Sequence, residues 1–349
     1  MSFEMLNYSD VMKATKEQRR YLLLGNGFSM SYNRDRFSFT SLLESAVKNK
    51  LIEESSAVYQ IFKEFDTKDF EEVVKLLETS VRVLKKYGVL HRADEKKILD
   101  DSILLKKHLV EIITNNHPEK ITEISDEEYL NSASFINNFE KIYTLNYDLL
   151  LYWSTIKLMD FIIQGKIKKG RLSPTDGFHE DDEFGKDYVI FGNDSSPQEI
   201  YFLHGALHIF DKKNKIIKNT YSRTDIALKE QTLENLKNDI YPIFVSEGTS
   251  EQKQAKIIHN AYLNNCYKSL SSIGGTKEPS NLIIFGTLLK TNDTHIREAI
   301  LKNKVKNIYF GISSEAEKNS LEEFSKKLAK ARVPKKVFFY DYATVTVWR

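Results

Sequence analysis

A series of short apolar runs, each bounded by turn residues, most constrains the fold of this chain. The runs are Tyr21–Leu24, Lys141–Leu145, Tyr188–Phe191, Ile200–Leu203, Pro242–Val245, Leu282–Phe285, Asn307–Phe310 and Lys336–Tyr340. Most are continuously apolar and do not alternate, which is typical of parallel strands covered on both faces. Helical patterns over Ile257–Leu270 and Glu315–Ala331 alternate with the last runs. We therefore predict an α/β protein with a Rossmann-like, doubly wound parallel sheet.

The gap between the first two runs is helical in character. Its clearest helix lies between Thr67, a candidate N-cap, and Gly88, a candidate C-terminal glycine. One face carries an apolar stripe formed by Phe70, Val73, Val74, Leu77, Val81 and Leu84. Further helices are predicted over Ser41–Lys48, Glu53–Phe65 and Glu95–Ile113. We predict an all-helical insertion, residues 36–135, within a domain formed by residues 1–35 and 136–349. The function that we first consider for this insertion is to form contacts between subunits of an oligomer.

Charge and cysteine content exclude several kinds of protein. The 51 basic residues nearly cancel the 49 acidic ones, and a net charge of +2 gives no field for direct nucleic-acid binding. The single cysteine, Cys266, excludes an internal disulfide and any zinc module that needs three or four cysteines. No apolar run approaches the ~20 residues of a membrane span, and the N-terminal residues lack the apolar segment of a secretory signal. A cytoplasmic protein is expected.

The stretch from Gly165 to Pro197 has the composition of a loop, with a basic segment, the acidic run HEDDE and the turn sequence NDSSP. A solvated surface excursion explains it most simply. A lid or a partner-binding loop is the alternative.

Ligands of a doubly wound sheet bind at the carboxyl ends of its strands, so the residues after each strand are the candidates. The first strand is followed by GNGFS, with Gly25, Asn26, Gly27 and Ser29. Glycines there allow close approach of a ligand, and backbone amides can bind a phosphate. Because the third glycine of the dinucleotide fingerprint is missing, a purely structural turn remains the alternative.

The second strand is followed by TLNYD. The carboxamide of Asn146 and the carboxylate of Asp148 are two residues apart and can point to the same side, which suits binding of a ribose or an amide. The alternative is that Asn146 caps the next helix and Asp148 favours its first turn.

The strand at Ile200–Leu203 is followed by His204 and Gly205. A histidine at this place is a candidate general base, and a histidine satisfied by local hydrogen bonds is the alternative. His208 lies four residues further on, but this spacing places two metal ligands on one face only in a helix, and the segment is predicted as strand and turn. No metal is expected.

The strand Leu282–Phe285 is followed by Gly286 and Thr287, which offer a backbone approach and a hydroxyl group. Asp293 and His295 could also be functional. Capping of the following helix by Asp293 or Thr294 is the simpler explanation.

These motifs occur in one order, G-x-G-x-S, T-x-N-x-D, H-G and G-T, and this order resembles the sirtuin superfamily. The resemblance covers the first strand and the chain from Lys141 onward, and leaves the helical insertion unmatched. The chain looks most like the divergent sirtuin-like proteins of bacterial antiphage defence, which hydrolyse NAD and some of which work with a HerA-type ATPase. Asn26, Tyr147 and Leu288 depart from the family pattern.

The resemblance implies a role for each matching residue. Asn146 would hold the nicotinamide ribose and the attacking water, Asp148 would bind the nicotinamide end, and His204 would be the general base. The remaining matches would bind the rest of NAD⁺: Gly25, Asn26, Gly27 and Ser29 at the phosphates, and Gly286 and Thr287 at the diphosphate or the adenine ribose.

The resemblance also implies what the chain does. Sirtuin deacylases carry a zinc module held by four cysteines, which this chain cannot build. The expected activity is therefore hydrolysis of NAD⁺, with NAD⁺ as substrate and water as acceptor, in a homo-oligomer or with a HerA-type ATPase partner. A non-catalytic subunit that senses NAD⁺ or a related nucleotide is the alternative.

Overall fold

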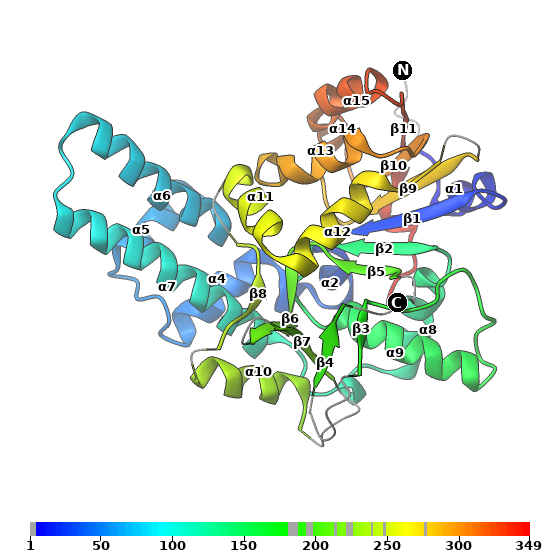
Figure 1. The fold of residues 1–349 in the computed structure, drawn as a ribbon, viewed down its shortest axis with the longest axis horizontal. Coiled ribbons are helices and arrows are strands. Elements are labelled where there is room, and N and C mark those ends of the chain that lie inside the picture. Colours follow the sequence, from blue (N-terminus) through cyan, green and yellow to red (C-terminus); the bar gives the residue numbers. More distant parts are fainter. Residues whose placement is uncertain are drawn as a thin grey trace.

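The computed structural model describes residues 5–180, 188–192, 198–212, 215–220, 226–238, 240–246, 249–275 and 278–349. A six-stranded, all-parallel sheet forms its centre (Figure 1). Its strands are β1 (Arg19–Leu24), β2 (Lys141–Thr144), β5 (Ile200–Phe202), β9 (Ser280–Phe285), β10 (Asn307–Ile312) and β11 (Lys336–Asp341). They lie in the order β11-β10-β9-β1-β2-β5, so the chain builds outward from β1 on one side and then returns to the other. The prediction of a Rossmann-like α/β fold is confirmed.

Helices cover both faces of this sheet. Leu24 is in register with Phe285, whose ring contacts Phe135 of α8 (Asp126–Ile136) at 5.7 Å between centroids. The residues one position earlier in these strands, Leu23 and its neighbours Ile284 and Tyr143, point to the other face of the sheet, because side chains alternate along a strand. On that face the Tyr143 hydroxyl lies 2.8 Å from Oγ of Ser269 in α12 (Ala261–Ser272). Strands enclosed in this way are continuously apolar, which is why the sequence revealed them.

Besides α12, the described residues form eight further α-helices that lie before residue 33 or after β2. They are α1 (Tyr8–Ala14), α2 (Gly27–Tyr32), α9 (Leu150–Ile163), α10 (Leu228–Lys237), α11 (Ser250–His259), α13 (Thr294–Lys302), α14 (Glu315–Ser320) and α15 (Glu322–Ala329). Two helices predicted as continuous are each divided in two. The break between α11 and α12 falls at Asn260, whose side chain accepts the amide proton of Leu263 and so caps a new helix.

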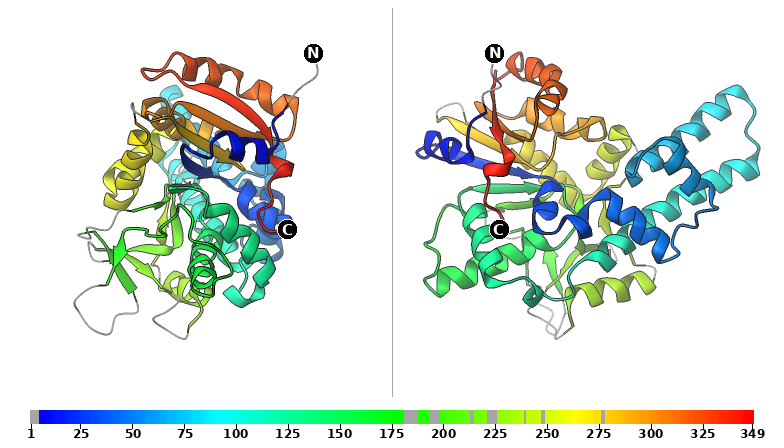
Figure 2. Two further views of the ribbon diagram at one scale, coloured as in Figure 1. Left: turned by 90° about the vertical axis from the view of Figure 1, so that its right-hand side faces the viewer. Right: turned by 180° about the vertical axis from the view of Figure 1, so that it is seen from behind.

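Between β1 and β2, all regular structure after α2 is helical in this fully described stretch. The elements are α3 (Arg34–Phe37), α4 (Phe39–Lys48), α5 (Ala57–Glu64), α6 (Phe70–Tyr87), α7 (Arg92–Asn116), a short 3₁₀ helix (Ile121–Glu123) and α8. Helices α5, α6 and α7 project from the rest of the molecule as an arm (Figures 1 and 2). Gly88 ends α6 with φ of 67°, as predicted. The N-cap prediction was wrong: Asp69, and not Thr67, accepts the first free amide protons of α6.

A second sheet of five antiparallel strands packs beside the first. Its order is β3 (Phe178–His179), β4 (Tyr188–Phe191), β7 (Lys215–Asn219), β6 (Gly205–Lys212) and β8 (Pro242–Phe244). The sequence correctly located β4 and β8 as strands but assigned them to a parallel sheet. Full burial of β8 makes an antiparallel strand look like a parallel one.

The stretch predicted as a loop, Gly165 to Pro197, therefore contains β3 and β4. Most of its acidic run, and its NDSSP segment, lie outside the described residues.

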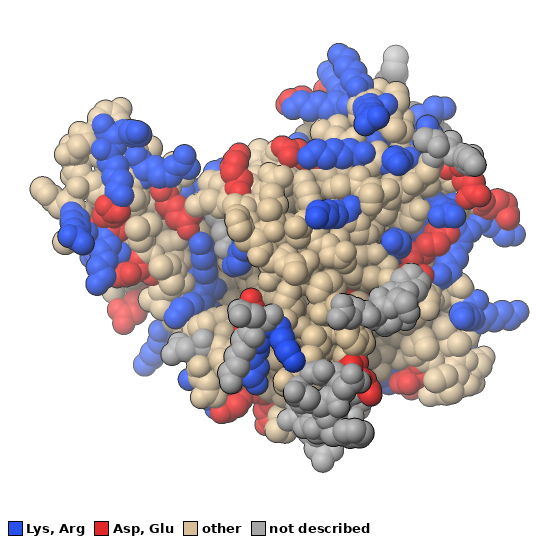
Figure 3. All heavy atoms as spheres, in the orientation of Figure 1, with Lys and Arg blue, Asp and Glu red and all other residues tan. Residues whose placement is uncertain are grey.

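The surface shows no single-sign field on the face drawn in Figure 3, where basic and acidic side chains are interspersed. Among the described helices, none combines the length and the apolar character that crossing a membrane requires.

Candidate active site

A cavity of about 580 Å³ lies at the carboxyl ends of the parallel strands. It opens at the point where strand order reverses, between β1 and β9, which is where ligands of doubly wound folds bind. Residues from both sides of this point line it: Gly25, Asn26, Gly27, Asn146, Asp148, His204, Gly286 and Thr287. All but one of the predicted site residues thus meet at one cavity. Ser29, the exception, lies directly behind it.

The two glycine turns pack backbone to backbone. A Cβ atom on Gly27 would lie 2.4 Å from Cα of Gly286, and one on Gly25 would lie 2.4 Å from Cβ of Thr287. Gly286 also has φ of 76°, a conformation that favours glycine. The amides of Gly25 and Gly27 donate to the carbonyls of Phe285 and Gly286, each at 2.9 Å. Contact between the turns accounts for these glycines, and binding of NAD⁺ by them stays a prediction.

Ser29 joins the two polar residues that follow β2. Its hydroxyl donates to Oδ2 of Asp148 at 2.5 Å and accepts a hydrogen bond from Nδ2 of Asn146 at 2.9 Å. All three side chains are buried. Burial raises the pKa of the Asp148 carboxyl, against the hydrogen bonds from Ser29 and from the Leu150 amide. Asn146 does not cap the next helix: the N-cap of α9 is Leu149, which makes no side-chain capping bond, and the Asn146 side chain is directed to Ser29. Asp148 accepts the amide proton of Leu150 in the first turn of α9.

His204 lies in the turn that connects the two sheets, two residues after the end of β5 and directly before β6. Gly205 begins β6 with φ of 82°, and a Cβ there would overlap the carbonyl oxygen of Ile243, so only glycine fits. The His204 ring is buried, and burial holds its pKa well below the usual range, with Lys253 and His295 acting in the same direction. The ring is therefore neutral at pH 7.

His204 contacts a second histidine that the sequence assigned to a helix terminus. Its Nε2 atom lies 3.0 Å from Nε2 of His295. The capping explanation for Asp293 was wrong: its side chain caps nothing, and its Oδ1 atom accepts from the ammonium of Lys253 at 3.2 Å. Spacing within the local helix could not reveal either contact, because the partners come from other elements.

Lys253 connects this cluster to the helical arm. Its side chain is buried, and its Nζ atom donates to Oε2 of Glu71 in α6 at 2.6 Å as well as to Asp293. Burial alone would lower the pKa of Lys253, but the two carboxylates outweigh it and raise that pKa. The Tyr147 hydroxyl lies 2.8 Å from the other oxygen of Glu71. The first turn of α6 thus forms a charged wall of the cavity that sequence analysis missed.

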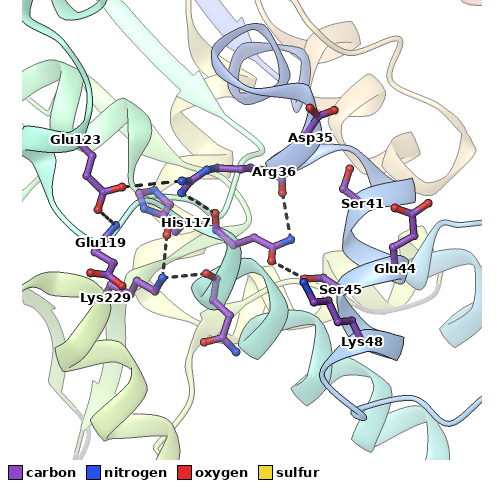
Figure 4. A pocket seen from close by; sticks show the side chains of 12 residues that line it. Asp35, Arg36, Ser41, Glu44, Ser45, Lys48, His117, Glu119, Glu123 and Lys229 are labelled. Carbon is purple, nitrogen blue, oxygen red and sulfur yellow. Dashed lines mark hydrogen bonds and ion pairs between the residues drawn. The ribbon is translucent and has the colours of Figure 1, made fainter.

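A larger hollow, about 760 Å³, lies at the base of the arm (Figure 4), and none of the predicted site residues lines it. Two of the cationic side chains that line it, Lys229 and Arg36, already bind backbone carbonyls at the C-terminal end of α7. Lys229 donates to the carbonyls of Asn115 and His117 at 2.9 and 3.0 Å, and Arg36 donates to that of Asn116 at 3.4 Å. They satisfy carbonyl groups that a helix end leaves free. This hollow is explained by the local fold.

Fold and cavity together define the class: a doubly wound α/β protein with a pocket at its topological switch point, lined by apolar side chains and by a set of polar and charged ones. More particularly, the chain belongs to the family described as a domain of unknown function, DUF4917, whose profile matches residues 22–348. No curated protein matches the chain.

Proposed function

We propose that this protein is a sirtuin-like NAD⁺ hydrolase that cleaves the bond between nicotinamide and ribose. The observation that carries the proposal is the meeting of Asn146, Asp148 and His204 at one cavity beside the two glycine turns. The cavity volume of about 580 Å³ falls within the range of roughly 300–1,000 Å³ that small-molecule and cofactor sites occupy.

The proposed reaction consumes NAD⁺ and water. The bond between ribose C1′ and the pyridinium nitrogen breaks, its electron pair passes to the ring, and neutral nicotinamide leaves. Water then bonds to the oxocarbenium-like C1′ and loses a proton, which gives ADP-ribose. Asn146 would hold this water, and His204, neutral because burial lowers its pKa, would accept the proton. Asp148 would bind the nicotinamide end, and the mechanism requires no metal.

In the cell, we propose a cytoplasmic effector of antiphage defence that depletes NAD⁺ when activated. Unregulated NAD⁺ cleavage would kill the host, so the resting protein would be held inactive by homo-oligomerisation or by a partner such as a HerA-type ATPase. Neither direct nucleic-acid binding nor membrane association is part of the proposal.

One observation favours the alternative, a sirtuin-like subunit that binds NAD⁺ or a related nucleotide and regulates its partner without turnover. The Nε2 atom of His204 already contacts His295, so one nitrogen of the proposed base is engaged before any substrate binds.

Release of nicotinamide from NAD⁺ by the purified protein, alone and with a candidate ATPase, tests the proposal. We expect His204→Ala and Asn146→Ala to lower the rate by about 100-fold or more. His259→Ala, which removes an exposed histidine of α11, should leave it unchanged. Binding of NAD⁺ without release of nicotinamide would support the sensing subunit, and absence of both would refute both proposals.

A further inference from the structure

His295 is the closest polar neighbour that the structure gives the His204 ring. It is the second residue of α13, and its side chain is buried. The two rings stack at 27° with centroids 5.2 Å apart and with the Nε2 atoms facing each other at 3.0 Å. Because this distance is that of a hydrogen bond, one of the two nitrogens carries a proton and the other accepts it.

Ser250, the first residue of α11, holds the other side of the His295 ring. Its Oγ atom accepts the backbone amide proton of His295 at 2.7 Å and lies 3.1 Å from Nδ1 of the same residue. The serine proton can be donated to Nδ1, or the serine can accept a proton from it. The first arrangement places the proton of His295 on Nε2, so that His295 donates to His204. The second arrangement reverses both hydrogen bonds: His295 donates from Nδ1 to Ser250, and its Nε2 atom accepts from Nε2 of His204.

We propose that Ser250 and His295 are positioning residues of His204, which fix the orientation and tautomer of its ring and share the charge it gains on accepting a proton. The role in catalysis rests on the proposed function, whereas the effect on the orientation and tautomer of His204 does not depend on it. In either arrangement, a single proton lies between the two Nε2 atoms, so the tautomer of His204 depends on that of His295 and, through it, on Ser250.

Charged groups surround the pair on two sides. Asp293 has Oδ1 4.0 Å from Nε2 of His204 and favours a positive charge there, whereas the Lys253 ammonium, bound to the same carboxylate, disfavours it. Asp293 and both histidines also offer ligand atoms within 4.8 Å of one another. A bound cation would share Asp293 with the Lys253 ammonium, which already binds its Oδ1 atom. Metal ligation is therefore the competing explanation that the experiment must separate from positioning.

Spectroscopy of histidine labelled with ¹³C and ¹⁵N tests the positioning role without any substrate. In the wild type at pH 7, we expect His204 and His295 each to show one tautomer with a shared N–H···N hydrogen bond. His295→Leu removes the partner and should change the tautomer signals of His204. His295→Gln replaces the imidazole by an amide that can still form a hydrogen bond, so it should change them less, and Ser250→Ala should alter those of His295. The matched control His259→Gln, an exposed histidine near the end of α11, should leave the pair unchanged.

Kinetics of nicotinamide release supply the second measurement. We expect His295→Leu to lower kcat by at least about tenfold, and by no more than His204→Ala does, with KM for NAD⁺ nearly unchanged and with partial rescue in His295→Gln. His204 signals and kcat that are unaffected by His295→Leu would overturn the proposal. So would stoichiometric metal in the purified protein whose removal by a chelator changes the His204 signals. If the wild type cleaves no NAD⁺ but the signals change as expected, the proposed function fails and the positioning role is upheld.

Discussion

Replacement of Lys253 by methionine should destabilise the protein because it leaves buried carboxylates without their cation. The ammonium binds Glu71 at 2.6 Å and Asp293 at 3.2 Å, and only 1% of its side chain is exposed. The side chains of Glu71 and Asp293 are 17% and 19% exposed, so water can solvate their unpaired charges only in part. Loss of one partner from a buried ion pair costs about 3–5 kcal/mol, and the partial exposure favours the lower value, about 3 kcal/mol.

The same variant should acquire a characteristic pH dependence. Burial raises the pKa of Glu71 and that of Asp69 already in the wild type, and Lys253 opposes this shift for both. Without the ammonium, the folded protein binds protons that the unfolded chain does not bind above its own carboxyl pKa of about 4. A folded state that binds more protons gains stability as pH falls. The deficit of Lys253→Met relative to wild type should therefore shrink between pH 7 and pH 5.

Urea unfolding at pH 7 and at pH 5 provides the measurement. Lys327→Met is the matched control, because it breaks an ion pair with Glu323 whose side chains are 61% and 82% exposed. Its effect should stay below about 1 kcal/mol. Adding Glu71→Gln to Lys253→Met should recover part of the lost stability, since it removes one of the unpaired charges. A loss below about 1 kcal/mol for Lys253→Met at pH 7 would refute the assignment of a buried ion pair.

Two further substitutions test the turns and the polar residues at the strand ends. Gly286→Ala should lower the free energy of unfolding by about 2 kcal/mol or more, because φ is 76° and its Cβ would lie 2.6 Å from Cα of Gly27. Gly275→Ala, where a Cβ meets nothing within 4 Å, is the control and should be nearly neutral. Equal thermal stabilities of the two variants would contradict the packing argument. Ser29→Ala should cost about 2 kcal/mol in urea unfolding, because it removes the hydrogen-bond partner of Oδ2 of buried Asp148 and of Nδ2 of buried Asn146. Ser80→Ala, an exposed helical serine, is the control, and a Ser29→Ala effect no larger than that of the control would count against the network.

The parallel sheet was predictable because burial on both faces leaves a local trace, a continuous apolar run. The same trace misled for β8, which is buried in an antiparallel sheet. Strand β6, from Gly205 to Lys212, was not among the predicted apolar runs, because His208 interrupts the run and two charged residues, Asp211 and Lys212, end it. Its burial pattern is nevertheless continuous up to Phe210, since His208 lies between the rings of Tyr152 and Phe202.

The cavity residues after the strands were predictable because fold topology brings strand ends together wherever the fold is doubly wound. The contacts of residues that reach the site from helices were not, although the sequence already indicated Asp293 and His295 as possible functional residues. Lys253 meets Glu71 across 182 positions of sequence, and His295 meets His204 across 91. In the sequence, a lysine or a glutamate on a helix indicates a solvated face. Only the packing of α6 and α13 against α11 turns these side chains inward.

The arm and the histidine pair are connected through one turn of α11. Ser250 and Lys253 are three residues apart, so they lie on the same face of that helix. Ser250 contacts His295, Lys253 binds Glu71 at the start of α6, and between them Gln252 donates to Glu78 further along α6. A shift of α6 that separates Glu71 from Lys253 would therefore act on the same turn that holds His295. The helical insertion is thus a wall of the cavity as well as a projecting arm (Figure 1).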